Sequence, residues 1–142
     1  MEKSRGEKNG KLKVAILYCQ HSVGQGRDIA ADLGREKEVS IYPSMLPCSS
    51  KLQLSHVLKI LDEKADGVEV VACADNSCSF LVGSCRAGRR ISFGRQMLDR
   101  IKVGGDRLGI TQKSGLTGMD LRKIARERAH AVKAIMLEGD KV

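Results

Sequence analysis

The stretch GVEVVAC, residues 67–73, is a short, largely apolar run rich in β-branched residues that ends in a cysteine. A largely apolar run of this length is typical of a strand that is buried on both faces of a sheet. It is preceded by KLQLSHVLKILDEK (51–64) and followed by GRRISFGRQMLDRIKVG (88–104). In the first of these segments the apolar residues recur at the spacing of one helical face. The three segments together predict a buried strand between two helices.

The same alternation extends along the chain in both directions. Strand patterns are followed by helical patterns in three further places: 13–19 by 24–34, 38–45 by the helix at 51–64, and 107–112 by 118–139. Alternating strands and helices are joined by right-handed crossovers, which produce a parallel sheet covered on both faces. The predicted fold class is therefore α/β, with a single doubly wound, mainly parallel four-stranded sheet and helices on both faces, as in flavodoxin-like proteins.

Length and hydropathy set the domain organisation and the expected compartment. A chain of 142 residues with 42% apolar residues can build one core, so we expect residues 1–12 to be a flexible N-terminus and residues 13–139 to form a single domain. No apolar run reaches the 18 or more residues of a membrane span. The basic start is followed only by the short apolar stretch VAILY, without a cleavage site, so we expect a cytoplasmic protein.

The charge of the chain indicates an acidic partner. Its net charge is +8, which favours an acidic protein surface, an anionic membrane or a nucleic acid as a partner. Only 3% of the residues are aromatic and none is Trp, so the stacking platform of single-stranded nucleic-acid binders is missing. We therefore expect no nucleic-acid partner, although a flavodoxin-like regulator suggested by the charge stays open as an alternative.

Four of the five cysteines follow strand patterns. Cys19 ends the first pattern, Cys48 lies in the loop after the second, Cys73 ends the third and Cys78 lies five residues further on. Loops after parallel strands converge at the carboxyl edge of a doubly wound sheet, where ligands bind. An odd number of cysteines in a cytoplasmic chain also argues against a disulfide framework. We expect these four thiols to meet at one edge.

The spacing of these cysteines favours an iron-sulfur centre over zinc. Zinc ribbons and fingers bring paired C-x2-C knuckles, whereas here the only close pair is Cys73 and Cys78 at C-x4-C. Iron-sulfur clusters accept cysteines that arrive singly from separate loops. The alternative is a thiol-based redox switch without iron, which would use Cys73, Cys78 or Cys85.

Four phrases of the chain, in their order, resemble one known family: ILYC (16–19), LPC (46–48), KADGVEVVACADNSC (64–78) and GSCRAGRR (83–90). They are similar to the delta, iron-sulfur subunit of methyl-viologen-reducing hydrogenases, and the match covers most of residues 12–137. That family has a phrase such as GADGVLVGGCHPGDCHY where this chain has residues 64–80. The first loop departs from the family, because CQHS stands here where the family commonly has CNWC, and Cys85 stands where the family tends to have Tyr or another residue.

The resemblance implies a small electron-transfer subunit that carries a 2Fe-2S cluster. Its implied cluster ligands are Cys19, Cys48, Cys73 and Cys78, each on a cysteine position of the family. Its implied partners are a heterodisulfide-reductase-like flavoprotein subunit and a hydrogenase or another electron-donating oxidoreductase. No residue of the chain has the setting of a substrate base or nucleophile, so we expect a non-catalytic subunit of an oxidoreductase complex.

Three further details concern the partner and the fold. Arg86, Arg89 and Arg90 lie just beyond the cysteine loop, and we expect them near the interface with an acidic partner surface. Thr117 is a candidate cap for the helix at 118–139. Arg128 interrupts the apolar face of that helix.

Overall fold

The computed structural model contains one sheet of four parallel strands in the order β2-β1-β3-β4. The structure describes residues 12–19, 23, 29–46, 52–72, 83–113 and 115–140, with the side chains of residues 30, 46, 83–86 and 137–140 excepted. The strands are β1 (Lys13–Cys19), β2 (Ser40–Leu46), β3 (Gly67–Ala72) and β4 (Leu108–Gln112). This is the order of the first four strands of a flavodoxin-type sheet.

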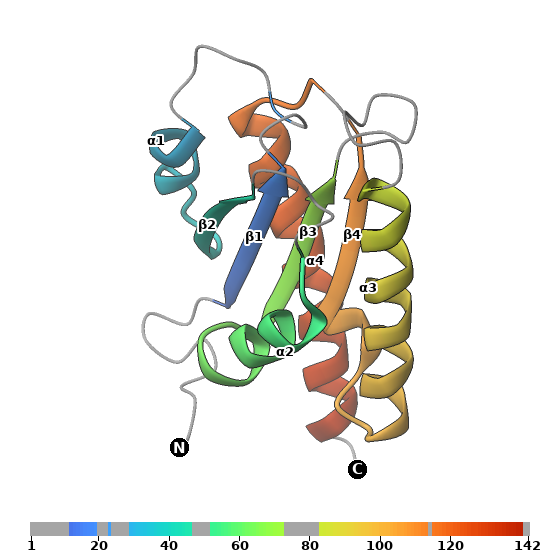
Figure 1. Ribbon diagram of the computed structural model, residues 1–142. Coiled ribbons are helices and arrows are strands. Elements are labelled where there is room, and N and C mark those ends of the chain that lie inside the picture. Colours follow the sequence, from blue (N-terminus) through green and yellow to red (C-terminus); the bar gives the residue numbers. More distant parts are fainter. Residues whose placement is uncertain are drawn as a thin grey trace.

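Helices cover both faces of the sheet (Figure 1). They are α1 (Ile29–Gly34), α2 (Leu54–Glu63), α3 (Gly83–Arg100) and α4 (Gly118–Asp140), with a short 3-10 turn, η4 (Gly105–Arg107), before β4. The core cluster between the sheet and α2 and α3 is separate from the cluster that α1 and α4 cover. The predicted doubly wound α/β fold is confirmed. None of the helices among the described residues is long and apolar enough to cross a membrane.

The central strands explain why this sequence makes two cores. Side chains alternate between the faces of a strand, so a strand covered on both sides needs apolar residues at nearly every position. In β1, Ala15 and Leu17 pack with α2 and α3, while Val14 and Ile16 pack with α1 and α4. All six residues of β3 are buried. Like β1, β3 contributes to both cores, with Val68 and Val70 in one and Val71 in the other.

The register brings the carboxyl ends of the strands level with one another. Cys19 at the end of β1 lies opposite Leu46 at the end of β2, and Tyr18 lies opposite Val71 in β3. Ala72, the last residue of β3, lies opposite Gln112 at the end of β4. The chain therefore leaves all four strands at one edge of the sheet, which is the upper edge in Figure 1.

The predicted bounds of the third helix were wrong at both ends. The helix begins at Gly83, not at residue 88, and ends at Arg100, not at residue 104. Its end is set by backbone conformation, because Lys102 (φ 63°) and Gly104 (φ 106°) adopt left-handed values that cannot continue a helix. The N–H groups of Val103 and Gly104 both donate to the carbonyl oxygen of Leu98, which closes the last turn.

Other predicted bounds differ by small amounts. The strand predicted at 38–45 is Ser40–Leu46, and the helix predicted at 51–64 is Leu54–Glu63. The strand predicted to start at residue 107 starts at Leu108, because Arg107 belongs to the 3-10 turn. For the helix predicted at 24–34, residues 24–28 lie outside the described part of the chain, which shows α1 from Ile29.

Thr117 caps α4, as predicted. Its hydroxyl oxygen accepts the backbone N–H of Asp120 at 3.2 Å, and its own N–H donates to Oδ2 of Asp120 at 2.9 Å. This reciprocal pair satisfies two N–H groups that a helix start leaves without intrahelical partners. The hydrogen bonds from the Thr117 N–H and hydroxyl also lower the pKa of Asp120.

Candidate functional site

Cys19 is the predicted ligand that the structure describes. It is the last residue of β1, the strand between β2 and β3, and its side chain is completely buried. By the alternation along the strand, it lies on the same face of the sheet as Ala15 and Leu17, toward the core of α2 and α3. A buried thiol at the carboxyl end of a central strand sits where doubly wound folds bind their ligands.

The other three predicted ligands, Cys48, Cys73 and Cys78, lie outside the described residues. Cys85 falls in the first turn of α3, at a position whose side chain is not described. Within the described ranges, no group of three or more His, Cys, Asp or Glu side chains is placed to hold a metal ion. The structure thus defines the strand ends from which the cysteine loops leave.

Those strand ends lie close enough together for the cysteines that follow them to reach one site. Neighbouring strands in a sheet lie about 4.8 Å apart, so the ends of β2 and β3, on either side of β1, are about 10 Å apart. Cys48 is two residues beyond the end of β2, and Cys73 directly follows the end of β3. Each extended residue adds at most about 3.5 Å of reach. Loops of this length can bring their thiols together at the end of β1, where Cys19 lies.

Two long helices begin at the same edge. The amino ends of α3 and α4 lie at the carboxyl end of the sheet, and both helices run away from it (Figure 1). The aligned peptide dipoles of a helix place partial positive charge at its amino end. The edge that holds Cys19 therefore favours an anionic group such as a thiolate-ligated centre.

An isolated β-bridge connects Val23, four residues after Cys19, to the segment that follows β4. Val23 pairs in parallel with Leu116, which lies in the segment between β4 and α4. Since β3 separates β1 from β4, this pairing crosses the carboxyl edge. Leu116 is buried in the core of α1 and α4, and Val23 packs against that core. The bridge therefore holds Val23 beside the segment that leads into α4.

A buried ion pair that the sequence analysis did not identify joins β3 to α4. Nε of Arg128 donates to Oε1 of Glu69 at 2.8 Å, and the hydroxyl of Thr111 donates to Oε2 of Glu69 at 2.6 Å. Arg128 also donates to the carbonyl oxygen of Asp106 at 2.8 Å. A Cβ at Gly109 would collide with the guanidinium, so a glycine is needed there. This pairing is the reason for the arginine that interrupts the apolar face of α4.

A second cluster of charges holds the segment after α1 against α4. Oε1 of Glu36 lies 3.1 Å from Nε of Arg122 and 3.8 Å from Nη1 of Arg126. Burial raises the pKa of Glu36, but this is outweighed by the hydrogen bonds from the Glu38 N–H and Arg122 and by the charges of both arginines. The net result is a lowered pKa, so Glu36 is a carboxylate at neutral pH.

The basic residues beyond the cysteine loop have different environments. Arg89 is exposed on α3, whereas Arg90 is half-buried and donates from Nη1 to the carbonyl oxygen of Leu52. The side chain of Arg86 is outside the described part. Arg89 is thus the one of these three that the structure shows open to solvent. His56 and His130 are both exposed.

Comparison with known proteins identifies the family. The model of the methyl-viologen-reducing hydrogenase delta subunit family matches residues 14–135, and this chain belongs to that family. The resemblance expected from the four phrases is thereby confirmed.

Several relatives match two thirds or more of the chain. It is 28% identical over 123 residues to the vhu iron-sulfur subunit of an F420-non-reducing hydrogenase from Methanococcus maripaludis, which covers 86% of this chain and 92% of that relative. The corresponding protein from Methanocaldococcus jannaschii is 33% identical over 100 residues, 67% of this chain and 72% of its own length. The iron-sulfur subunit of an F420-non-reducing hydrogenase from Archaeoglobus profundus is 23% identical over 114 residues, 80% of this chain and 83% of its own.

Proposed function

We propose that this chain is an electron-transfer subunit that carries a 2Fe-2S cluster. In this proposal it relays electrons between a hydrogenase or another oxidoreductase and a heterodisulfide-reductase-like flavoprotein. The cluster ligands are Cys19, Cys48, Cys73 and Cys78, within a single domain formed by residues 13–139. The names of the relatives support the cofactor class and the complex, since they are called iron-sulfur subunits of hydrogenases. The type of cluster and the flavoprotein partner come from the family resemblance.

The observation that carries the proposal is the position of Cys19. It is fully buried at the end of β1, and the two strands that precede Cys48 and Cys73 are the immediate neighbours of β1. Cys19 therefore lies at the end of β1, and Cys48 and Cys73 follow in the sequence the level ends of the two adjacent strands. This is the edge where folds of this class bind ligands. A cysteine that merely filled the core would need no such arrangement with the others.

The residues around this edge suit an electron carrier. A bound iron-sulfur cluster supplies a site that gains and loses one electron, and its potential depends on local charge, hydrogen bonds to sulfur and exposure to solvent. Burial of Cys19 keeps water from its sulfur. The amino ends of α3 and α4 add positive potential, which stabilises the more negative reduced state and raises the reduction potential.

The test is the iron and sulfide content of a series of Cys→Ser variants, purified without oxygen. Serine is a harder and poorer ligand for iron than a thiolate. We expect Cys73→Ser and Cys78→Ser to lose most of the iron and the visible absorption of the wild-type chain. Cys85→Ser is the matched control, since it removes a thiol of the same region that is not in the proposed ligand set, and it should keep both.

Two results would contradict the proposal. Loss of iron in Cys85→Ser together with its retention in Cys19→Ser would show that the ligand set is wrong. A wild-type chain without visible absorption, in which thiols among Cys73, Cys78 and Cys85 oxidise reversibly to a disulfide, would instead identify a thiol switch.

A further inference from the structure

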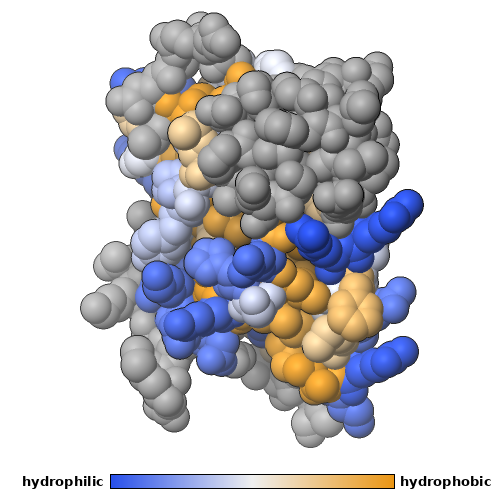
Figure 2. All heavy atoms as spheres, in the orientation of Figure 1, coloured by the Kyte–Doolittle hydropathy of each residue, from blue (hydrophilic) through white to orange (hydrophobic). Residues whose placement is uncertain are grey.

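The solvent side of α3 carries an apolar stripe that the fold leaves uncovered. Phe93, Met97 and Ile101 follow one another at intervals of four residues and are 56%, 37% and 67% exposed. Ile101 and Val103 follow the end of the helix at Arg100 and continue the stripe. Ile101 keeps the helical spacing, because its N–H donates to the carbonyl oxygen of Met97. At a rise of about 1.5 Å per residue, the stripe from Phe93 to Ile101 is about 12 Å long. Figure 2 shows hydrophobic side chains gathered over this side of the molecule, between hydrophilic ones.

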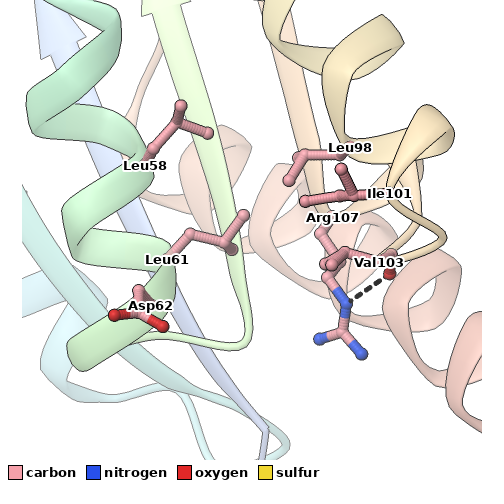
Figure 3. Close-up of a pocket in the computed structure, with 7 residues that line it drawn as sticks. All are labelled: Leu58, Leu61, Asp62, Leu98, Ile101, Val103 and Arg107. Atoms are coloured by element: carbon pink, nitrogen blue, oxygen red, sulfur yellow. Dashed lines mark hydrogen bonds between the residues drawn. The ribbon is translucent and has the colours of Figure 1, made fainter.

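The stripe runs into a groove between α2 and α3. The groove has a volume of about 250 Å³ and is lined by Leu58, Leu61, Asp62, Leu98, Ile101, Val103 and Arg107. In Figure 3 the leucines of α2 face Leu98 of α3, and Ile101 just beyond that helix, across this space. Pockets for drug-sized ligands are commonly about 300–1,000 Å³, so this groove is better suited to one or two large apolar side chains of a protein.

The charges beside the stripe indicate which kind of partner protein can bind there. Helix α3 carries five arginines and one aspartate. Arg95 is paired with Asp106 at 3.0 Å, but within the described part of the chain neither Arg89 nor Arg100 contacts a carboxylate. These two exposed arginines lie on the outward side of the stripe, where they can meet carboxylates of a partner.

We propose that the α3 stripe and its groove form a docking surface for an amphipathic helix of a partner protein, with acidic residues beside its apolar face. Apolar side chains of that helix at positions i, i+4 and i+7 pack on Phe93, Met97 and Ile101, and one of them enters the groove. A second copy of this chain is a poor occupant, because two arginine-rich helices repel each other. A bilayer fits less well, because part of this apolar surface lies inside the groove between α2 and α3, which a flat surface does not reach.

This surface is separate from the proposed cluster site. The stripe occupies the half of α3 that is distant from the carboxyl edge of the sheet, and the groove lies near the end of α2 and the start of β4. A partner docked there leaves the cysteine edge accessible to a second partner, as an electron relay requires. The inference rests on the proposed function for the existence of partner proteins, but the docking measurement does not depend on the iron content.

The test uses the full chain and a pair of synthetic helical peptides. Both have leucines at i, i+4 and i+7; one carries glutamates beside them and the other carries lysines. We expect the glutamate peptide to bind at least about tenfold more tightly at low salt, with the difference shrinking as salt screens the charges. The double variant Phe93→Ala, Met97→Ala should weaken that binding about tenfold or more, since apolar anchors dominate such interfaces.

The matched control is Met119→Ala, which removes a methionine that is 60% exposed on α4, in the opposite helix layer. It should leave peptide binding unchanged. Equal binding of the two peptides, no binding of either, or binding that survives the double variant would overturn the proposal. Self-association that Phe93→Ala abolishes would identify a second copy as the occupant, and binding to anionic phospholipid vesicles in preference to the glutamate peptide would identify a membrane surface; either result overturns it.

Discussion

The amino and carboxyl ends of the strands differ in the surroundings of their polar groups. At the amino end, charged side chains contact the protein itself: Oδ2 of Asp66 accepts the Lys13 N–H at 2.9 Å, and Arg107 donates to the carbonyl oxygens of Val103 and Asp66 at 3.1 Å each. At the carboxyl end, the strands lead into the cysteine loops, beside the amino ends of α3 and α4. The polar contacts at the amino end stabilise the fold, and the carboxyl end is where we propose the ligand site.

The largest expected effect on stability comes from the buried ion pair in the α4 layer, below the cysteine edge. Arg128→Met leaves the Glu69 carboxylate, whose side chain is 3% exposed, without its charged partner. Breaking one half of a buried pair costs about 3–5 kcal/mol, so we expect a loss of that size in the free energy of unfolding, measured with urea. The double variant Glu69→Leu, Arg128→Met should recover most of it. A loss below about 1 kcal/mol in the single variant would contradict this role.

Glu36 makes a smaller contribution to the free energy of unfolding, and this contribution depends on pH. Because the fold lowers its pKa below the ordinary 4.5, its contribution is complete above that value and is lost as the pH falls through the folded-state pKa. We expect Glu36→Gln to lower the free energy of unfolding by about 1–2 kcal/mol at pH 7 and to differ little from the wild type under strongly acidic conditions. A difference that grows as the pH falls would contradict the assignment.

Loss of the Thr117 cap at the amino end of α4 should have the smallest effect on stability. Thr117→Ala removes the hydroxyl that accepts the Asp120 N–H, and loss of such a cap costs about 1 kcal/mol. The pKa of Asp120, followed by NMR, should rise toward its ordinary value of 3.8. Thr117→Ser keeps the hydroxyl and serves as the control. If alanine and serine variants unfold alike, the hydroxyl does not cap the helix.

The fold could be predicted because its signals are local. The central strands β1 and β3 are short, largely apolar runs, and the first predicted strand has the observed bounds of β1, Lys13–Cys19. The third helix was misplaced because its end depends on backbone angles at Lys102 and Gly104, whereas the apolar residues Ile101 and Val103 continue the helical pattern in the sequence. Those two side chains are exposed instead of buried.

The polar interactions could not be predicted, because they depend on the register of distant segments. Arg128 stands out in the sequence as an interruption of an apolar face, but Glu69 is 59 residues away and meets it only once β3 and α4 are packed together. The exposed stripe did leave a signal in the sequence. Phe93, Met97 and Ile101 recur at helical spacing on a face other than that of the buried Ile91 and Leu98, so the helix has more apolar residues than one core needs.

Electron paramagnetic resonance of the reduced full chain, purified without oxygen, is the most direct test of a 2Fe-2S cluster at the carboxyl edge. Quantified against the iron content, the spectrum should show one unpaired spin for each pair of iron atoms, and Cys19→Ser should lose or alter this signal because Cys19 is the ligand proposed at the end of the central strand β1. A chain that binds no iron, or a signal that Cys19→Ser leaves unchanged, would contradict the cluster site proposed for this edge.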